Sequence, residues 1–190
     1  MYAQPVHDYI QELKAKLFPN DENVEYDIIE DLTEDLVEED TAAIDYLCYK
    51  PLLLAIHDEF NDAYGSADYL EYTVYDFDGD GVKELIVKAG TCEADYVWRI
   101  YTIADNEARY IGTTFGGHST IYACPDGGFY NMMAHMGFEE IYRVIYSYDT
   151  VFEGLISSRE LAEAEDYSTP GIPIHTEYIT NPILLENGFQ

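Results

Sequence analysis

The segment Asp76–Leu85, with the sequence Asp-Phe-Asp-Gly-Asp-Gly-Val-Lys-Glu-Leu, limits the fold of this 190-residue chain more than any other feature. It carries carboxylates at alternate positions and a further one after the second glycine: Asp76, Asp78, Asp80 and Glu84. The flanking residues 69–75 and 82–88 are rich in β-branched residues and tyrosine, which is typical of strands. The segment therefore predicts a tight acidic loop between two strands.

Crowded carboxylates repel one another unless a cation lies between them. Calcium takes about six to eight oxygen ligands, which a short loop supplies by wrapping around the ion. Gly81 suits the strained backbone of such a loop. We therefore predict a calcium site, with Glu84 binding directly or through water. Its expected ligands are the side chains of Asp76, Asp78, Asp80 and Glu84 and the carbonyl of Val82. The alternative is an acidic hairpin turn without a metal, because Asp and Gly are common turn residues.

The loop differs from an EF-hand at its end. An EF-hand loop closes with a bidentate glutamate at about its twelfth residue, and the twelfth residue counted from Asp76 is Val87. The residues after Gly81 favour a strand, and no helix is expected on either side. The ion is thus expected to join two strands, without the helix movement by which EF-hand sensors respond to calcium.

This run resembles the D-x-D-G-D-G-x-x-E-L loops of FG-GAP and VCBS-type bacterial surface proteins, in which the loop joins two strands and holds calcium. The motif recurs in blades in those proteins and occurs once here. The resemblance implies calcium ligands at the same five positions. Residues 90–96, 116–119 and 134–137 are also similar to an uncharacterised family of secreted or lipid-anchored proteins from anaerobic Gram-positive bacteria. That second resemblance covers about residues 65 to 180 and implies no known activity.

Acidic residues dominate the composition. The chain has 9 Lys and Arg against 38 Asp and Glu, which gives a formal net charge of -29. Such a charge repels nucleic acid and anionic membrane surfaces, so we expect no nucleic-acid partner. The expected partners are calcium and a protein or carbohydrate ligand at the cell surface. A hydrophobic share of 47% argues for a folded core despite the charge.

The sequence shows no transmembrane segment and no signal peptide, because its first five residues lack a basic and an apolar stretch. We nevertheless expect an extracellular or cell-surface location, with the cytoplasm as the alternative. A calcium site without a closing bidentate glutamate is expected to be weak, and calcium reaches the millimolar range only outside cells. Cys48, Cys92 and Cys124 are too few for a disulfide framework. We expect free thiols, with a Cys92–Cys124 pair as the alternative.

The N-terminal part, residues 1–66, reads as a helical segment packed on a sheet. A first helix is predicted from Val6 to Leu17, and a second, with a solvated acidic face, lies within residues 21–45. Pro51 is expected to begin a third helix, which Gly65 ends. The buried face of this third helix is predicted to consist of Leu53, Ile56, Phe60 and Tyr64.

The second part, residues 67–190, reads as an antiparallel β domain that contains the calcium loop at 76–84. Eight strands in a meander are predicted at 69–76, 82–89, 96–103, 108–114, 119–123, 128–134, 140–148 and 150–156. A short helix from Ser158 to Glu165 and an irregular C-terminal segment follow. The expected class is α+β, with N-terminal helices packed on a curved or partly closed sheet.

Two other functions stay open. An acidic inhibitor that mimics DNA is suggested by the net charge and by the twelve acidic residues within 21–45. A hydrolase is suggested by His118 and His135, which fall near predicted strand ends and which, with Cys92, Glu93, Asp95 or Cys124, could build a zinc site or an acid-base pair. No catalytic motif accompanies them, so the calcium-binding surface module is the preferred hypothesis.

Overall fold

The structure is a computed structural model that describes residues 48–148, 150–162 and 165–179. All of these residues belong to one compact unit, Thr41–Gln190. The two helices predicted within residues 1–45 lie outside the described part of the chain. The predicted division of the chain into a helical part and a β part therefore stays a prediction.

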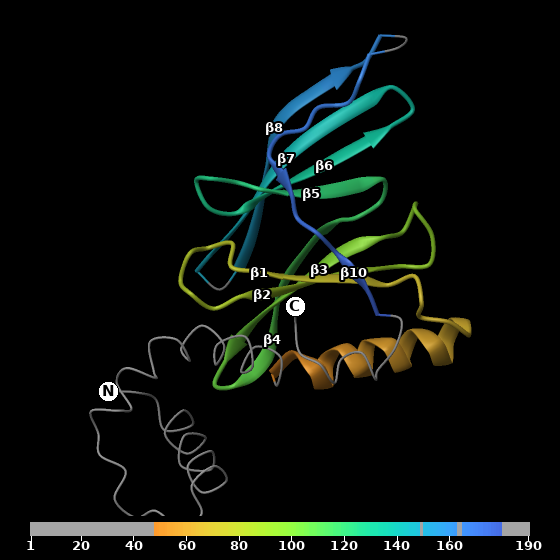
Figure 1. Cartoon of the computed structure of the whole chain (residues 1–190), viewed down its shortest axis with the longest axis vertical. Coiled ribbons are helices and arrows are strands. Elements are labelled where there is room, and N and C mark those ends of the chain that lie inside the picture. Colours follow the sequence, from red (N-terminus) through yellow and green to blue (C-terminus); the bar gives the residue numbers. More distant parts are fainter. Residues whose placement is uncertain (1–47, 149, 163–164, 180–190) are drawn as a thin grey trace, which may run out of the picture. The chain divides into compact units, whose positions relative to one another are not determined.

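Two open antiparallel sheets of five strands each make up most of the described structure (Figure 1). The first has the order β10-β1-β2-β3-β4 and the second the order β8-β7-β6-β5-β9. Four consecutive strands thus form a meander in each sheet, and a short strand is added at one edge. The first sheet contains β1 (Glu71–Tyr75), β2 (Glu84–Ala89), β3 (Val97–Ala104), β4 (Glu107–Phe115) and β10 (Glu177–Tyr178). The second contains β5 (Ser119–Ala123), β6 (Phe129–His135), β7 (Phe138–Ser147), β8 (Thr150–Glu160) and β9 (Ile172–Pro173).

The eight predicted strands correspond to β1 through β8, but the single curved or partly closed sheet is a wrong prediction. The chain leaves the first sheet after β4 and enters the second at β5, with no pairing between these two strands. At this point Gly117 lies directly against the loop before β3, where an added Cβ would collide with the carbonyl oxygen of Glu93. With one described helix and two five-stranded sheets, the described fold is mostly β and only partly α+β.

One helix, described over residues 48–64, packs on the first sheet. Leu53, Ile56 and Phe60 are buried there, as predicted. They contact a group of apolar side chains on one face of the sheet, among them Leu85, Val87 and Tyr101. The list of buried helix residues predicted from the sequence is wrong at Tyr64, which is 62% exposed, and the helix is already present at residue 48, before Pro51. Gly65 ends it with a φ of 79°, in agreement with its predicted role. The helix of the described chain is not long and apolar enough to cross a membrane.

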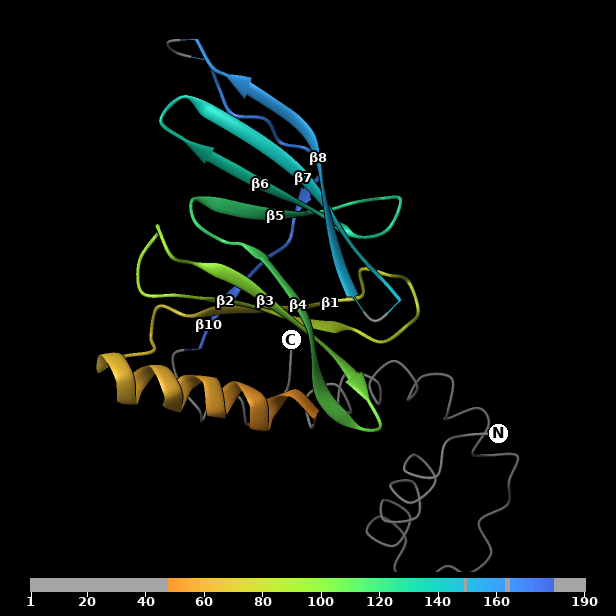
Figure 2. The same cartoon turned by 180° about the vertical axis from the view of Figure 1, so that it is seen from behind.

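The other face of the first sheet packs against the second sheet. Side chains of both sheets meet in one buried cluster made of Phe77, Ile86, Trp98, Ile100, Ile111, Ile121, Phe129 and Val144. Figures 1 and 2 show the helix and the second sheet on opposite sides of the first sheet. Because β2 lies between β1 and β3 in a sheet covered on both faces, all six of its residues are buried. The first of these six is Glu84.

The short helix predicted from Ser158 to Glu165 is a wrong prediction. β8 continues to Glu160, and the described residues after it are not helical. Arg159 lies opposite Glu139 of β7, and its guanidinium Nε is 3.1 Å from a carboxylate oxygen of Glu139. This cross-strand pair holds the end of β8 in the sheet. The described residues after 164 contain only the short strands β9 and β10, in keeping with the predicted irregular segment.

Candidate metal site

The acidic loop joins β1 and β2, as the sequence predicts. Tyr75 at the end of β1 pairs with Glu84 at the start of β2, so residues 76–83 form the connection. Phe77 is buried and packs edge-on against Phe129 of the second sheet, with ring centroids 5.5 Å apart. The backbone N–H of Gly128 also donates to the carbonyl of Phe77. These contacts hold the middle of the loop against the second sheet.

The backbone of the loop wraps around the side chain of Asp76. One carboxylate oxygen of Asp76 accepts a hydrogen bond from Gly79 N–H at 2.8 Å, and the other accepts one from Gly81 N–H at 3.1 Å. Gly79 and Gly81 have φ angles of 79° and 89°, a conformation that side chains with a Cβ rarely adopt. The prediction that this loop needs glycine for a strained backbone is therefore confirmed.

Three of the four predicted carboxylates come together. Asp76, Asp78 and Glu84 each offer one oxygen within 4.8 Å of the others. Asp80 does not belong to this group; its carboxylate accepts a hydrogen bond from the N–H of Val82 at 2.8 Å. An oxygen of Asp78 in turn accepts one from the N–H of Asp80, at 3.2 Å. The convergent group thus consists of one buried and two more accessible carboxylates.

Glu84 is the unusual member of this group because it is 0% exposed. One of its oxygens accepts a hydrogen bond from Phe77 N–H at 3.3 Å, and the other accepts one from the Thr102 hydroxyl at 3.1 Å. Burial raises the pKa of Glu84 to about 8; the two hydrogen bonds lower it, and the nearby charges of Asp78 and Asp80 raise it. The main cause is therefore the loss of hydration on burial, which the two hydrogen bonds only partly offset.

The pKa of Asp78 is raised as well. Burial is the main cause that raises its pKa, and the carboxylates of Asp80 and Asp76 raise it further, against a hydrogen bond from the backbone of Asp80. The ion pairs formed within the described part of the chain involve other acids, namely Asp58, Glu93, Glu139 and Glu165. Among the described residues, therefore, no side-chain cation neutralises the loop.

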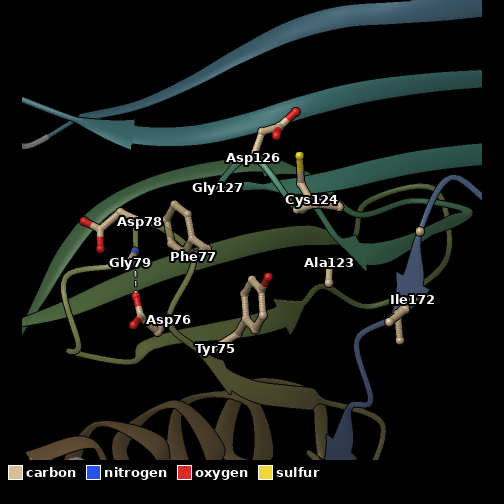
Figure 3. Close-up of a pocket in the computed structure, with 12 residues that line it drawn as sticks. Tyr75, Asp76, Phe77, Asp78, Gly79, Ala123, Cys124, Asp126, Gly127 and Ile172 are labelled. Carbon is tan, nitrogen blue, oxygen red and sulfur yellow. Dashed lines mark hydrogen bonds between the residues drawn. The ribbon is translucent and has the colours of Figure 1, made fainter.

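A cleft of about 700 Å³ opens beside the loop (Figure 3). Asp76 and Asp78 line it from the loop, and Cys124 and Asp126 line it from the turn between β5 and β6. Figure 3 shows Phe77 pointing toward that turn, while the hydrogen bond from Gly79 holds Asp76 in the loop. The cleft gives solvent and ions access to the two aspartates.

The donor set is made of oxygens alone. Carboxylates and backbone carbonyls are the ligands of hard cations, whereas zinc and copper favour nitrogen and sulfur. Calcium suits the three convergent carboxylates better than magnesium, which keeps several waters and uses fewer carboxylates. The residues present therefore fit a calcium ion, which would be held by Asp76, Asp78 and Glu84.

The structure brings some of the predicted zinc or acid-base residues together and separates others. The rings of His118 and His135 are stacked, with centroids 3.8 Å apart, and Glu93 lies 3.7 Å from a ring nitrogen of His118. Cys124 is buried beside the acidic loop, and Asp95 accepts hydrogen bonds within its own loop. Neither histidine lines the cleft beside the acidic loop. Cys92 and Cys124, the alternative disulfide pair, are both free thiols.

Two residues that support the site were not predictable from local sequence patterns. Thr102 reaches Glu84 from β3, 18 residues away, and a lone threonine in a strand carries no local signal of that contact. Phe77 reads as an ordinary loop residue, although its N–H donates to Glu84 and its ring anchors the loop. A register prediction that paired β2 with β3 at Ile86 and Ile100 would have placed Thr102 beside Glu84.

Comparisons of this chain with family models, with curated proteins and with solved structures found no match. The chemistry of the loop therefore carries the functional argument.

Proposed function

We propose that this protein is a calcium-binding module in which the ion joins β1 and β2 and holds the acidic loop in its folded form. The observation that carries the proposal is the convergence of Asp76 and Asp78 on Glu84, a carboxylate buried between the sheets. A calcium ion there offsets the repulsion among the three acids and gives the buried charge a partner. Asp80 and Val82, predicted as further ligands, take part once the loop closes around the ion.

The proposed role of the ion is structural. The loop is anchored at Phe77 and lies between two strands, so it has no helices that calcium could swing apart. Calcium binding then contributes directly to folding free energy, because the unfolded chain holds no preformed site. The open cleft beside the loop leaves room for a ligand on the module, which we propose is a protein or carbohydrate group at a cell surface.

An extracellular or cell-surface location follows from this proposal. The site uses one buried and two accessible carboxylates and lacks a closing bidentate glutamate, so its affinity is expected to suit millimolar calcium. The net charge of -29 favours cations and basic partners in general, in keeping with such a location.

Thermal unfolding of the full chain with calcium and with chelator tests the proposal. A ligand at about 100 times its Kd stabilises the folded state by about 2.7 kcal/mol. For a chain of this length that corresponds to an increase of about 5–10 °C in melting temperature. The Asp78→Ala variant is expected to lose this increase.

Asp126→Asn is the matched control, because Asp126 is exposed on the neighbouring turn and does not belong to the convergent group. It is expected to keep the full increase. Equal melting curves of the unmodified protein in calcium and in chelator would overturn the proposal, and so would an Asp78→Ala variant that still gains stability from calcium.

A further inference from the structure

We propose that His118 and His135 form a second metal site, which takes a divalent first-row transition metal such as Zn²⁺. The site lies where the chain enters the second sheet, and none of its residues belongs to the calcium loop. It therefore does not depend on the calcium proposal.

The backbone brings the two histidines side by side. His118 precedes β5 and His135 ends β6, and these two strands are paired. The N–H of Ala134 donates to the carbonyl of His118 at 3.0 Å, which extends the pairing up to the two rings. The ring centroids are 3.8 Å apart, and the ring planes are 9° from parallel. The sheet thus fixes the spacing of two imidazoles on its surface.

Glu93 supports His118 from the loop before β3. Its carboxylate accepts a hydrogen bond from the backbone N–H of His118 at 2.9 Å, and the same oxygen is 3.7 Å from Nδ1 of that ring. Gly117 permits this approach, because a Cβ there would collide with the carbonyl of Glu93. A carboxylate beside one ring nitrogen commonly orients a metal-binding histidine and leaves its other nitrogen for the ion.

The pair differs from a histidine that merely fills a core. His135 is exposed, the His118 side chain is 36% exposed, and the described residues form no hydrogen bond with the His135 ring. Imidazole nitrogens suit zinc, copper and nickel, while calcium prefers oxygen. A ring nitrogen binds an ion in the plane of its ring, so binding requires the exposed ring of His135 to rotate out of the stack. Its exposure leaves room for that rotation.

Titration of the full chain with Zn²⁺, in a buffer that contains millimolar calcium, tests this site. The variants are His118→Asn and His135→Gln, because Asn tolerates the positive φ of 50° at position 118. Each is expected to weaken zinc binding by more than about tenfold. His175→Gln is the matched control, since His175 is exposed and is not part of the pair, and it is expected to leave zinc affinity unchanged.

Ring-proton NMR signals of His118 and His135 are expected to shift together as zinc is added, which a purely structural pair would not show. Glu93→Gln keeps an oxygen that accepts from the backbone of residue 118, and it is expected to weaken zinc binding by about tenfold. Unchanged zinc affinity in His135→Gln, whose side chain is exposed, would overturn the proposal even if His118→Asn failed to fold. So would an equal loss in His175→Gln.

One further variant distinguishes the proposed zinc site from the proposed calcium site. Asp78→Asn removes a calcium ligand and is expected to keep the zinc affinity of the unmodified protein. Loss of zinc binding in Asp78→Asn, together with its retention in His135→Gln, would place the zinc at the calcium loop and overturn the histidine site.

Discussion

Glu84 and Glu139 occupy similar positions in the two sheets, each near the start of a strand and each almost sealed from solvent, at 0% and 1% exposed. Their partners differ. Glu139 accepts hydrogen bonds from Arg159 at 3.1 Å and from the N–H of Ser168 at 2.5 Å. Within the described part of the chain, Glu84 accepts hydrogen bonds from neutral groups alone, the N–H of Phe77 and the hydroxyl of Thr102.

The pKa values of the two glutamates move in opposite directions. Burial raises the pKa of Glu139, but the hydrogen bonds from Ser168 and Arg159 and the charge of Arg159 outweigh burial and hold it below its usual value. Burial raises the pKa of Glu84 to about 8, and its two hydrogen bonds do not offset this. Among the described residues, Glu139 thus has a cationic partner, Arg159, whereas Glu84 has none. This difference supports the proposal that a cation from solution neutralises Glu84.

The largest expected effect is the loss of calcium stabilisation in Glu84→Gln. The amide keeps the shape of the side chain and removes its charge, so the variant is expected to melt at or above the temperature of the unmodified protein in chelator. In calcium it is expected to lack the increase of about 5–10 °C that the unmodified protein shows. Differential scanning calorimetry in both buffers measures this. An unchanged calcium-dependent increase would show that Glu84 is not a ligand.

The second-largest effect is expected at Arg159, the cationic partner of Glu139. Arg159→Met leaves the carboxylate of Glu139 buried without its partner and also removes the hydrogen bonds from Arg159 to Ser168 and Glu165. The melting temperature is expected to fall by about 4–8 °C, with or without calcium. The double variant with Glu139→Gln is expected to recover part of this loss, because it no longer buries an unpaired charge. A double variant as unstable as Arg159→Met alone would break the parallel between the two glutamates.

The smallest effect is expected at Asp95, an exposed acid that needs no cation. Its carboxylate accepts hydrogen bonds from the hydroxyl and the N–H of Thr91 and from the N–H of Cys92, and these lower its pKa from 3.8 to about 2. Because the folded-state pKa is the lower one, its contribution to stability is present above pH 3.8 and is lost as the pH falls toward 2. Carboxyl-carbon NMR is expected to give a titration midpoint near pH 2, and Thr91→Val is expected to raise it. A midpoint of 3.8 in the unmodified protein would mean that these hydrogen bonds do not form in solution.

The strand–loop–strand element was predictable because its signals are local. Asp76, Gly79 and Gly81 lie within six residues. The positive φ angles of the two glycines and the carboxylate of Asp76, which accepts their hydrogen bonds, determine the turn. The turn between β3 and β4 was predictable for the same reason, since Asp105 and Asn106 adopt the positive φ angles, 54° and 63°, that such residues tolerate.

The split into two sheets was not predictable from local signals. It lies where β4 and β5 follow each other in sequence without pairing, and Gly117 there packs against Glu93, a residue far away in the sequence. The burial of Glu84 likewise depends on β2 being central in a sheet covered on both faces, and its partner Thr102 comes from another strand. Near the end of β8, which extends to Glu160, Arg159 forms an ion pair with Glu139 on the neighbouring strand β7. Each of these features is a long-range pairing, which a single sequence does not reveal.

Calorimetric titration of calcium into the metal-free full chain tests the central claim most directly. The account predicts saturable binding of one calcium ion per chain, weakened by more than about tenfold in Glu84→Gln and unchanged in Asp126→Asn. Absence of calcium binding at millimolar concentration would contradict it, and so would binding of equal strength in Glu84→Gln.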